Sequence, residues 1–183
     1  MTQPAEMLSS GPVALRRWRE EDVDVLHALV VGAREHLVPW MPFAATHDRV
    51  RGEAWLAECQ EEWASGDAFH FAITVDGEPA GSCSLMRRIG AGALEIGYWL
   101  HPAWTGRGLV TAAVRALVEA GRGLPGIDRV EIHHDVANTA SGAVPRRLGF
   151  TEVGRRPYEG PSAPADTGTD LVWRWSFGSP AGA

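Results

Sequence analysis

The order of secondary-structure signals along this 183-residue chain predicts one mixed α+β domain. Helical spacing dominates the first third, three β-type segments then follow in close succession, and helices and strands alternate to the end. We therefore expect a central, mostly antiparallel sheet of about seven strands flanked by about four helices. The domain should span residues 13–177, with flexible ends at 1–12 and 178–183.

The N-terminal third should supply one strand and two helices. Residues 13–18 are expected to form the strand, and the acidic run Glu20–Asp22 suits the positive start of a helix. Residues 37–45 are apolar but contain two prolines, which predicts a structured loop. A second helix is predicted over 47–65 and should stop at Gly66.

The middle of the chain predicts antiparallel strands. Residues 69–75 and 80–88 flank the turn sequence Asp76–Pro79, which is typical of a hairpin. Residues 94–100 should form the next strand. A helix that opens at Gly106-Arg107-Gly108 leads to a further strand at 129–136. Because strand–helix–strand crossovers join parallel strands with right-handed connections, these last two strands should be parallel.

The C-terminal part should add a short helix at 139–148 and strands at 150–156 and 171–177. A loop is expected over 157–168. No internal repeat is visible.

Composition excludes several classes of protein. Hydrophobic residues make up 45% and charged residues 22% of the chain, which is an ordinary globular composition. No apolar stretch reaches the ~20 residues that cross a bilayer, so we expect no membrane partner. The net charge is −6 and all 17 basic residues are arginine, which argues against nucleic acid as a partner. The absence of lysine fits the codon bias of a G+C-rich genome.

The charge is unevenly distributed. The segment from Glu20 to Asp67 holds 11 acidic residues and three arginines, whereas the rest of the chain is close to neutral. Cys59 and Cys83 are too few for a disulfide framework and should be small core residues. The N-terminus lacks a basic-then-apolar signal, so a cytoplasmic location is expected.

Gly106 and Gly108 mark the most informative turn, in the segment HPAWTGRGLVT. Glycines allow backbone N–H groups to approach a ligand closely, and a helix start favours anions. The turn lacks the Gly-Lys-Ser/Thr of a P-loop and the third glycine of a dinucleotide-binding fingerprint. Taken alone, it equally fits a tight connection without a ligand.

Two longer blocks resemble the GNAT acetyltransferase superfamily. They are GALEIGYWLHPAWTGRGLVTAAVRALVEAG and RVEIHHDVANTASGAVPRRLGFTEVG. The segments LRRWREEDVD and VPWMP are similar to the RimJ/RimL-like branch, so the resemblance covers about residues 13–177. It implies an N-acetyltransferase that passes an acetyl or other short acyl group directly from acyl-CoA to a primary amine in a ternary complex.

The resemblance also implies where CoA lies. The fourth and fifth predicted strands, 94–100 and 129–136, should splay apart, with pantetheine in the gap and pyrophosphate on the glycine turn. Thr105 and Val110 depart from the family pattern, so we expect weaker CoA binding, not its loss. The implied CoA-binding residues are Leu100, His101, Thr105, Gly106, Arg107, Gly108, Leu109, Val110, Asn138 and Ser141.

Glu95 is the first candidate for the base, because it matches a glutamate of many family members and shares a strand face with Trp99. A carboxylate beside tryptophan suits proton uptake near neutrality; an ion pair with an arginine is the alternative reading. Asp135 and His134, acting through water, are weaker candidates.

Ser141 is the candidate proton donor to the thioester sulfur. Asn138 and Ser141 match an Asn-x-x-Ser pattern of the branch, although both also fit ordinary helix-start roles. Pro145 stands where many GNAT members carry a tyrosine acid, and it should free the Ser141 carbonyl from its helical partner. His133 and His134 are adjacent on a strand and face opposite sides, so we expect no metal.

The acceptor should lie under the first two helices and their loop. The resemblance implies substrate contacts from Trp40, Met41, Phe43 and Trp99, and the acidic segment could attract a cationic amine. Solvated helix faces would explain the same charges. We expect a protein N-terminal α-amine as acceptor, with a small-molecule amine close behind, and a homodimer by resemblance. A non-catalytic acyl-CoA-binding regulatory module and a protein-interaction domain are the competing classes.

Overall fold

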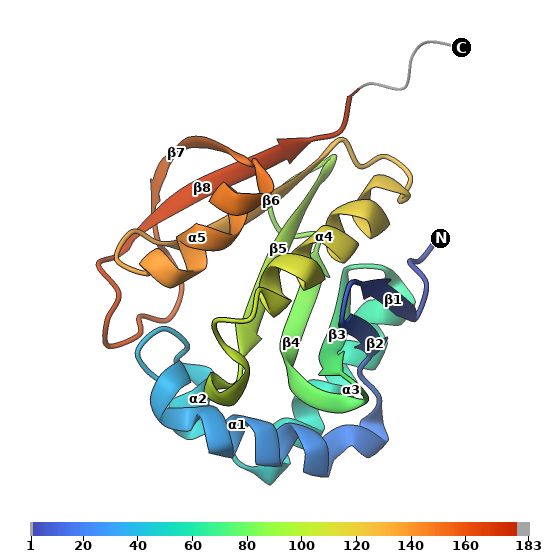
Figure 1. Ribbon diagram of the computed structural model, residues 1–183, viewed down its shortest axis with the longest axis vertical. Helices are drawn as coiled ribbons and strands as arrows, with labels where there is room; N and C mark the ends of the chain where they lie inside the picture. The colour runs from blue at the N-terminus through green and yellow to red at the C-terminus, as the bar shows by residue number, and fades with distance from the viewer. Residues whose placement is uncertain (1, 179–183) are drawn as a thin grey trace.

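The computed structural model describes residues 2–178, which form an eight-stranded sheet and five α-helices (Figure 1). No helix in this part of the chain is long and apolar enough to cross a membrane. The strands are β1 (Met7–Ser10), β2 (Val13–Arg17), β3 (Ala68–Val75), β4 (Glu78–Met86), β5 (Ala93–Leu100), β6 (Arg129–Asp135), β7 (Thr151–Pro157) and β8 (Thr169–Ser176). The helices are α1 (Val23–Leu37), α2 (Phe43–Thr46), α3 (Arg49–Ser65), α4 (Leu109–Arg122) and α5 (Thr139–Leu148).

The sheet has the order β1-β2-β3-β4-β5-β6-β8-β7. Its neighbours are antiparallel except β5 and β6, which are parallel, as the crossover through α4 predicts. β5 and β6 pair only from Ala93 to Glu95 and from Arg129 to Glu131. Beyond these residues the two strands diverge, which gives the sheet the V shape visible in Figure 1. The predicted splay is therefore confirmed.

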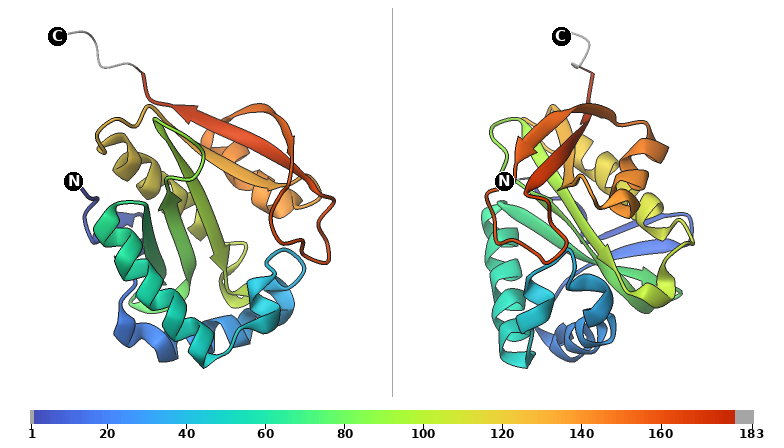
Figure 2. Two further views of the ribbon diagram at one scale, coloured as in Figure 1. Left: turned by 180° about the vertical axis from the view of Figure 1, so that it is seen from behind. Right: turned by 90° about the vertical axis from the view of Figure 1, so that its left-hand side faces the viewer.

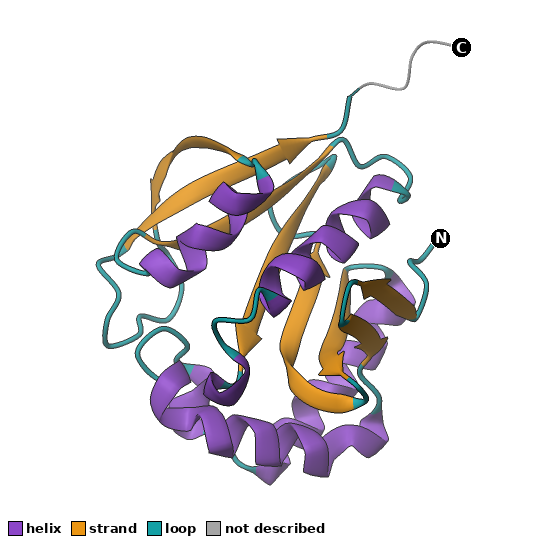
Figure 3. Ribbon diagram, in the orientation of Figure 1, coloured by secondary structure: helices purple, strands orange, loops and turns teal. Residues whose placement is uncertain are grey.

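The helices cover both faces of the sheet (Figures 2 and 3). α4 packs on one face through Ala113, Val114 and Leu117, in the larger of two apolar clusters. α1 and α3 pack on the other face in a second cluster that includes Trp18, Leu26 and Leu56, all nearly inaccessible to solvent. Each of these three helices thus buries one apolar stripe against the sheet.

Local signals set the ends of these elements. Asp48 accepts a hydrogen bond from Arg51 N at the start of α3, and Gly66 ends that helix in the left-handed region, with φ 83°. Asn138 and Gly149 play the same two roles for α5. The β3–β4 hairpin turns at Asp76 and Gly77, which both have positive φ, as a type I′ turn requires.

Three details differ from the sequence-based expectation. Met7–Ser10, placed outside the domain in residues 1–12, forms β1 and pairs with β2, because Leu8 packs against the main core. The loop at 37–45 contains the first part of the short helix α2. The predicted flexible tail, apart from Gly178, lies outside the described residues.

Gly81 allows β4 to lie close to the C-terminal end of β5, in the part of β5 that is no longer paired with β6. It pairs with Leu100, and a Cβ at residue 81 would overlap the carbonyl oxygen of Trp99 and lie 2.9 Å from Leu100 Cα. We predict that Gly81→Ala lowers the free energy of unfolding by about 1–3 kcal/mol, because backbone must move to admit the methyl group. Chemical denaturation measures this loss.

Gly123→Ala is the matched control, because Gly123 is exposed and a Cβ there makes only ordinary contacts with α4 carbonyl oxygens. We expect it to be neutral or slightly stabilising. Equal destabilisation by both substitutions would contradict the close approach of β4 and β5.

Candidate active site

A first cavity of about 480 Å³ lies between the end of β5, the turn before α4, and α5. We call it the donor cavity. It contains eight of the ten residues predicted to bind CoA, so the fold gathers a set that spans more than 40 positions of sequence. Those eight are Leu100, Thr105, Gly106, Gly108, Leu109, Val110, Asn138 and Ser141.

The turn before α4 presents free backbone donors to this cavity. Gly106 and Gly108 have φ of 76° and 73°, and no atom lies within 4 Å of a Cβ built on either. The first helical bond of α4 runs from Ala112 N to Gly108 O, so the N–H groups of the first three helical residues have no helical partner. Free N–H groups at a positive helix end suit a phosphate-sized anion.

The side chains of Thr105 and Arg107 in the turn contact neighbouring groups of the protein. Thr105 Oγ1 donates to Pro102 O at 2.9 Å, and the Arg107 guanidinium lies over the Trp104 ring, 5.1 Å from its centroid. Arg107 is therefore outside the cavity lining, whereas Arg147, from the last turn of α5, lines it. The arginine that lines the cavity is therefore Arg147 and not the predicted Arg107.

The backbone of β5 is open on the side of β6. His101 N donates to Ala80 O at 2.8 Å, so its N–H is already bonded, and its ring packs against α1 at Gly32. In an antiparallel ladder, alternate residues turn their backbone groups to opposite sides. The N–H and C=O of Tyr98 and Leu100 therefore turn toward β6, which pairs with β5 only as far as Glu95.

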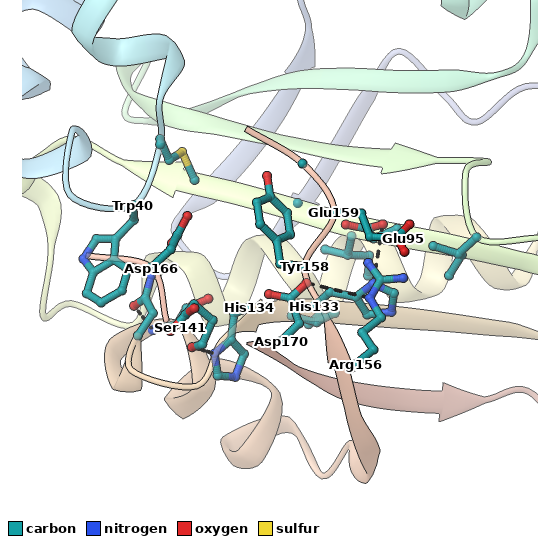
Figure 4. A pocket seen from close by; sticks show the side chains of 18 of the residues that line it. Trp40, Glu95, His133, His134, Ser141, Arg156, Tyr158, Glu159, Asp166 and Asp170 are labelled. Atoms are coloured by element: carbon teal, nitrogen blue, oxygen red, sulfur yellow. Dashed lines mark hydrogen bonds and ion pairs between the residues drawn. The ribbon is translucent and has the colours of Figure 1, made fainter. Parts of the chain in front are cut away.

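A second cavity, of about 650 Å³, lies beyond the donor cavity in the gap between β5 and β6 (Figure 4). We call it the acceptor cavity. Trp40 and Ser141 stand at one end of the view and Glu95 and Glu159 at the other, with Asp170 between them. Its charged lining consists of Glu95, Asp135, Glu159, Asp166 and Asp170 together with Arg88 and Arg156.

The two cavities meet at a shared set of residues: Trp40, Met41, Tyr98, Asn138 and Ser141. Tyr98 OH donates to the Ser141 carbonyl at 2.9 Å, and Ser141 Oγ donates to the Tyr98 oxygen at 3.2 Å. Asn138 Oδ1 accepts from Ser141 N at 3.1 Å, which is the helix-start role that its position also allowed. A group held in one cavity can thus reach a group held in the other at Ser141.

Glu95 forms the ion pair that its sequence position left open. Arg88 Nε and Nη2 bond both carboxylate oxygens at 2.9 and 2.6 Å, and the Glu95 side chain is only 7% exposed. His133 Nδ1 lies 3.7 Å from Glu95 Oε2. Both acceptor atoms of the first candidate base are therefore engaged by an arginine.

Glu131 lies beside Glu95 in the register of β5 and β6 and anchors a buried charge network. It accepts hydrogen bonds from His133 at 2.9 Å, from Arg129 at 3.1 Å and from Arg174 at 2.9 Å. Burial alone would raise the pKa of Glu131, but these bonds outweigh burial and hold the pKa below its ordinary value. The network ties β6 to β8.

Asp135 and His134, the weaker candidate bases, are both committed to structure. Asp135 accepts from Ala137 N and from the backbone and hydroxyl of Thr167, and these bonds outweigh burial and lower its pKa. His134 Nδ1 bonds the Asp135 carbonyl at 2.7 Å, while its Nε2 accepts from Trp173 Nε1 at 2.9 Å. Neither residue keeps a free atom for proton transfer in this arrangement.

Asp170 differs from these carboxylates. It is 6% exposed, and burial raises its pKa, an effect that Arg156, 3.7 Å away, partly offsets. A buried carboxyl with a raised pKa in a cavity is a candidate for proton transfer. The sequence did not single out Asp170, because only the pairing of β6, β8 and β7 brings it beside the cavity.

The acidic segment 20–67 does not line the acceptor cavity with charge. Its side chains there are Trp40 and Met41, two of the four residues for which the resemblance implies substrate contacts. Acids of the segment pair elsewhere: Asp22 with Arg16 at 2.7 Å and Glu62 with His70 at 2.6 Å. The cavity's acids come instead from β5, β6, β8 and the loop before β8. Of the two readings of these charges, the structure therefore favours solvated or ion-paired helix faces over attraction of the amine.

Phe43 and Trp99, the other predicted substrate contacts, lie beside each other with ring centroids 6.3 Å apart. Both line a third, smaller cavity of about 200 Å³ under α1 and α3, and Trp99 also lines the donor cavity. Phe43 is absent from the lining of the acceptor cavity. Within the described residues, no group of three or more His, Cys, Asp or Glu side chains could hold a metal ion.

Comparison with known proteins places this chain in a family. Residues 13–151 match the family model for the acetyltransferase (GNAT) domain. The chain therefore belongs to the GNAT family and is an N-acetyltransferase.

Particular relatives narrow the comparison. A Bacillus subtilis (strain 168) protein named "Putative ribosomal N-acetyltransferase YdaF" is 30% identical over 148 residues, which cover 78% of this chain and 80% of YdaF. RimL, a ribosomal L7/L12 α-N-protein acetyltransferase solved with coenzyme A, is 25% identical with a TM-score of 0.85, over 93% of this chain and 98% of RimL. RimJ of Mycobacterium smegmatis, solved in complex with CoA-disulfide, shares the fold at 23% identity and a TM-score of 0.82, over 96% and 90% of the two chains.

The lowered pKa of Glu131 predicts acid-sensitive stability. A carboxylate whose folded pKa is depressed contributes stability that is present above its ordinary pKa of 4.5 and is lost as the pH falls through the lower folded value. We predict that Glu131→Gln lowers the melting temperature at pH 7, and that its difference from the unmodified protein shrinks as the pH falls below 4.5. Thermal unfolding across pH 7 to about 3 measures this.

Glu152→Gln is the control, because Glu152 is exposed on β7. Its melting temperature should follow that of the unmodified protein at every pH. A Glu131→Gln deficit that stays constant down to the lowest pH would contradict the role of the charge.

Proposed function

We propose that this N-acetyltransferase transfers an acetyl or other short acyl group from acyl-CoA to a primary amine, and that the acceptor is a protein N-terminal α-amine. The single observation that supports this most is the meeting of two cavities at Ser141, with anion-binding backbone donors in one and acidic side chains in the other. Acyl-CoA would supply the thioester and a thiolate leaving group. Direct transfer needs both substrates at this meeting point.

The donor cavity fits an acyl-CoA. Open space beside Gly106 and Gly108 and the free N–H groups at the start of α4 suit a pyrophosphate, and the unpaired edge of β5 suits an extended amide-containing arm. Thr105 and Val110 leave these backbone donors intact. Arg147 adds a positive charge that the turn's own Arg107 does not direct into the cavity.

The acceptor cavity fits a cationic amine. Five carboxylates and two arginines line it, so its field attracts a protonated amine before transfer. An α-amine has a pKa of ~8 and a lysine side chain has a pKa of ~10.4, so an α-amine loses its proton more readily. The name of RimL records α-N-protein acetylation and that of YdaF records ribosomal N-acetylation, which supports the same class of acceptor here.

We assign chemical roles on this basis. Ser141 would donate a hydrogen bond to the sulfur as the thiolate leaves, since its Oγ stands where the cavities meet. Glu95, predicted from the sequence, and Asp170, predicted from the structure, are the two candidate acceptors for the proton of the amine. Asp170 is favoured, because Arg88 already bonds both oxygens of Glu95.

Thiol release from acetyl-CoA tests this function. We predict release with peptides that have a free N-terminus, and a roughly 10–100-fold lower kcat in Ser141→Ala, which loses the donor to sulfur. The rate should fall as the pH drops through the raised pKa of Asp170, because the base must be deprotonated, and Asp170→Asn should remove this fall. Glu152→Gln, an exposed carboxylate outside both cavities, is the control.

Other results would redirect the proposal. If Glu95→Gln no longer shows the fall in rate at low pH, while Asp170→Asn still shows it, the base is Glu95 and not Asp170. Release with small amines but not with peptides would shift the acceptor class, and tight CoA binding without any release would favour a regulatory module. Failure to bind CoA would contradict the whole assignment.

Gly108 allows a separate test of the donor cavity. We predict that Gly108→Ala weakens CoA binding about tenfold, because alanine is strained at φ 73° and the amides of the turn would shift. Gly126→Ala is a matched control with the same φ of 73° and equally open space, in the loop after α4. Both variants should lose similar stability by thermal unfolding, whereas only Gly108→Ala should lose affinity by calorimetry.

A further inference from the structure

We propose that Tyr98 is a positioning residue that fixes the Ser141 hydroxyl at the junction of the two cavities, and that Pro145 makes this possible by leaving the Ser141 carbonyl free. The inference rests on the proposed acyl transfer for its functional part. Its structural part concerns three side chains of this chain and can be tested without any substrate.

Pro145 creates the acceptor. In an α-helix the carbonyl of residue 141 accepts from the N–H of residue 145, but proline has no N–H and its ring crowds that carbonyl. Pro145 is buried inside α5, four residues after Ser141. The released carbonyl receives the Tyr98 hydroxyl from β5 at 2.9 Å. A proline within α5 and a tyrosine on the strand opposite thus form one arrangement.

The direction of the hydrogen bonds follows from the count of protons. A phenol has one proton, and Tyr98 gives it to the Ser141 carbonyl. The Tyr98 oxygen can therefore only accept from Ser141 Oγ, at 3.2 Å. This longer bond is the one that Ser141 exchanges when its proton turns to the sulfur, while the shorter bond keeps Tyr98 and the start of α5 in place.

The phenol is suited to holding Ser141 and not to supplying the proton itself. Burial raises the pKa of Tyr98 to about 12, and the bond with Ser141 opposes this only in part. The one proton of the phenol is already donated to the Ser141 carbonyl, so Ser141 Oγ, and not Tyr98, has a proton to direct to the sulfur. Tyr98 therefore stays neutral through the reaction and acts through Ser141.

A double-substitution cycle tests the structural part. Tyr98→Phe leaves the Ser141 carbonyl without its phenol partner and should lower the melting temperature by about 2–4 °C. In Pro145→Ala, residue 145 regains an N–H that can bond the same carbonyl. In the Pro145→Ala background, Tyr98→Phe should then lower the melting temperature by less than half as much. Additive effects of the two substitutions would overturn the linkage.

Pro125→Ala is the matched control for loss of a proline. Pro125 is exposed in the loop between α4 and β6, so its substitution carries the same change in chain entropy without any link to Ser141. Its effect on the melting temperature should add to that of Tyr98→Phe. If the effects of Pro125→Ala and Tyr98→Phe are also non-additive, the double-substitution cycle does not report on the Ser141 carbonyl.

Kinetics test the positioning role. We expect Tyr98→Phe to lower kcat about tenfold with the KM for acetyl-CoA changed less than twofold, because the ordering of Ser141 matters only as the thiolate leaves. The pH–rate profile should keep its shape, whereas loss of an alkaline limb would make Tyr98 the acid. An unchanged kcat would overturn positioning. If the unmodified protein transfers no acyl group, the positioning role fails with the proposed function, and the melting cycle still decides the hydrogen-bond linkage.

Discussion

Glu95 and Glu131 stand opposite each other at the last paired position of β5 and β6, and two buried carboxylates in that register repel. Arg88 bonds one, while Arg129, Arg174 and His133 bond the other, so the sheet stays closed up to this point. Beyond it no ladder joins the strands. The V of the sheet thus begins at this charged junction, and the acceptor cavity occupies the space between the separated strands.

The separation of β5 from β6 also means that different elements of the fold line the two cavities. Residues from the start of α4 and from α5 line the donor cavity, whereas residues from β6, β8 and the loop before β8 line the acceptor cavity. α5 belongs to both, since Asn138 and Ser141 occupy its N-terminal end. Small shifts of this helix would therefore alter both cavities together, which explains why the tie from Tyr98 to its first turn matters.

Sequence patterns predicted the parts of the structure that depend on neighbours in the chain. The crossover, the glycine turn and the helix ends at Asn138 and Gly149 follow from local spacing and backbone preference. The partners of charged side chains did not follow. Arg88 reaches Glu95 across a hairpin, and Asp170 joins the cavity through a strand order in which β8 lies between β6 and β7. Tyr98 shares a face of β5 with the core residues Ile96 and Leu100, and only the tertiary position of α5 distinguishes it from them.

The buried cysteines have a consequence for how the molecule responds to oxidation. Cys59 and Cys83 are both unpaired and nearly inaccessible, burial raises the pKa of each thiol, and neither lines the donor or the acceptor cavity. Such thiols are poor nucleophiles in the folded state. RimL was solved with CoA in a disulfide with one of its cysteines. In the proposed transfer, the folded chain offers the released CoA no comparable thiol among the described residues. A disulfide reagent added to a working sample would then report the released CoA against a nearly silent protein background.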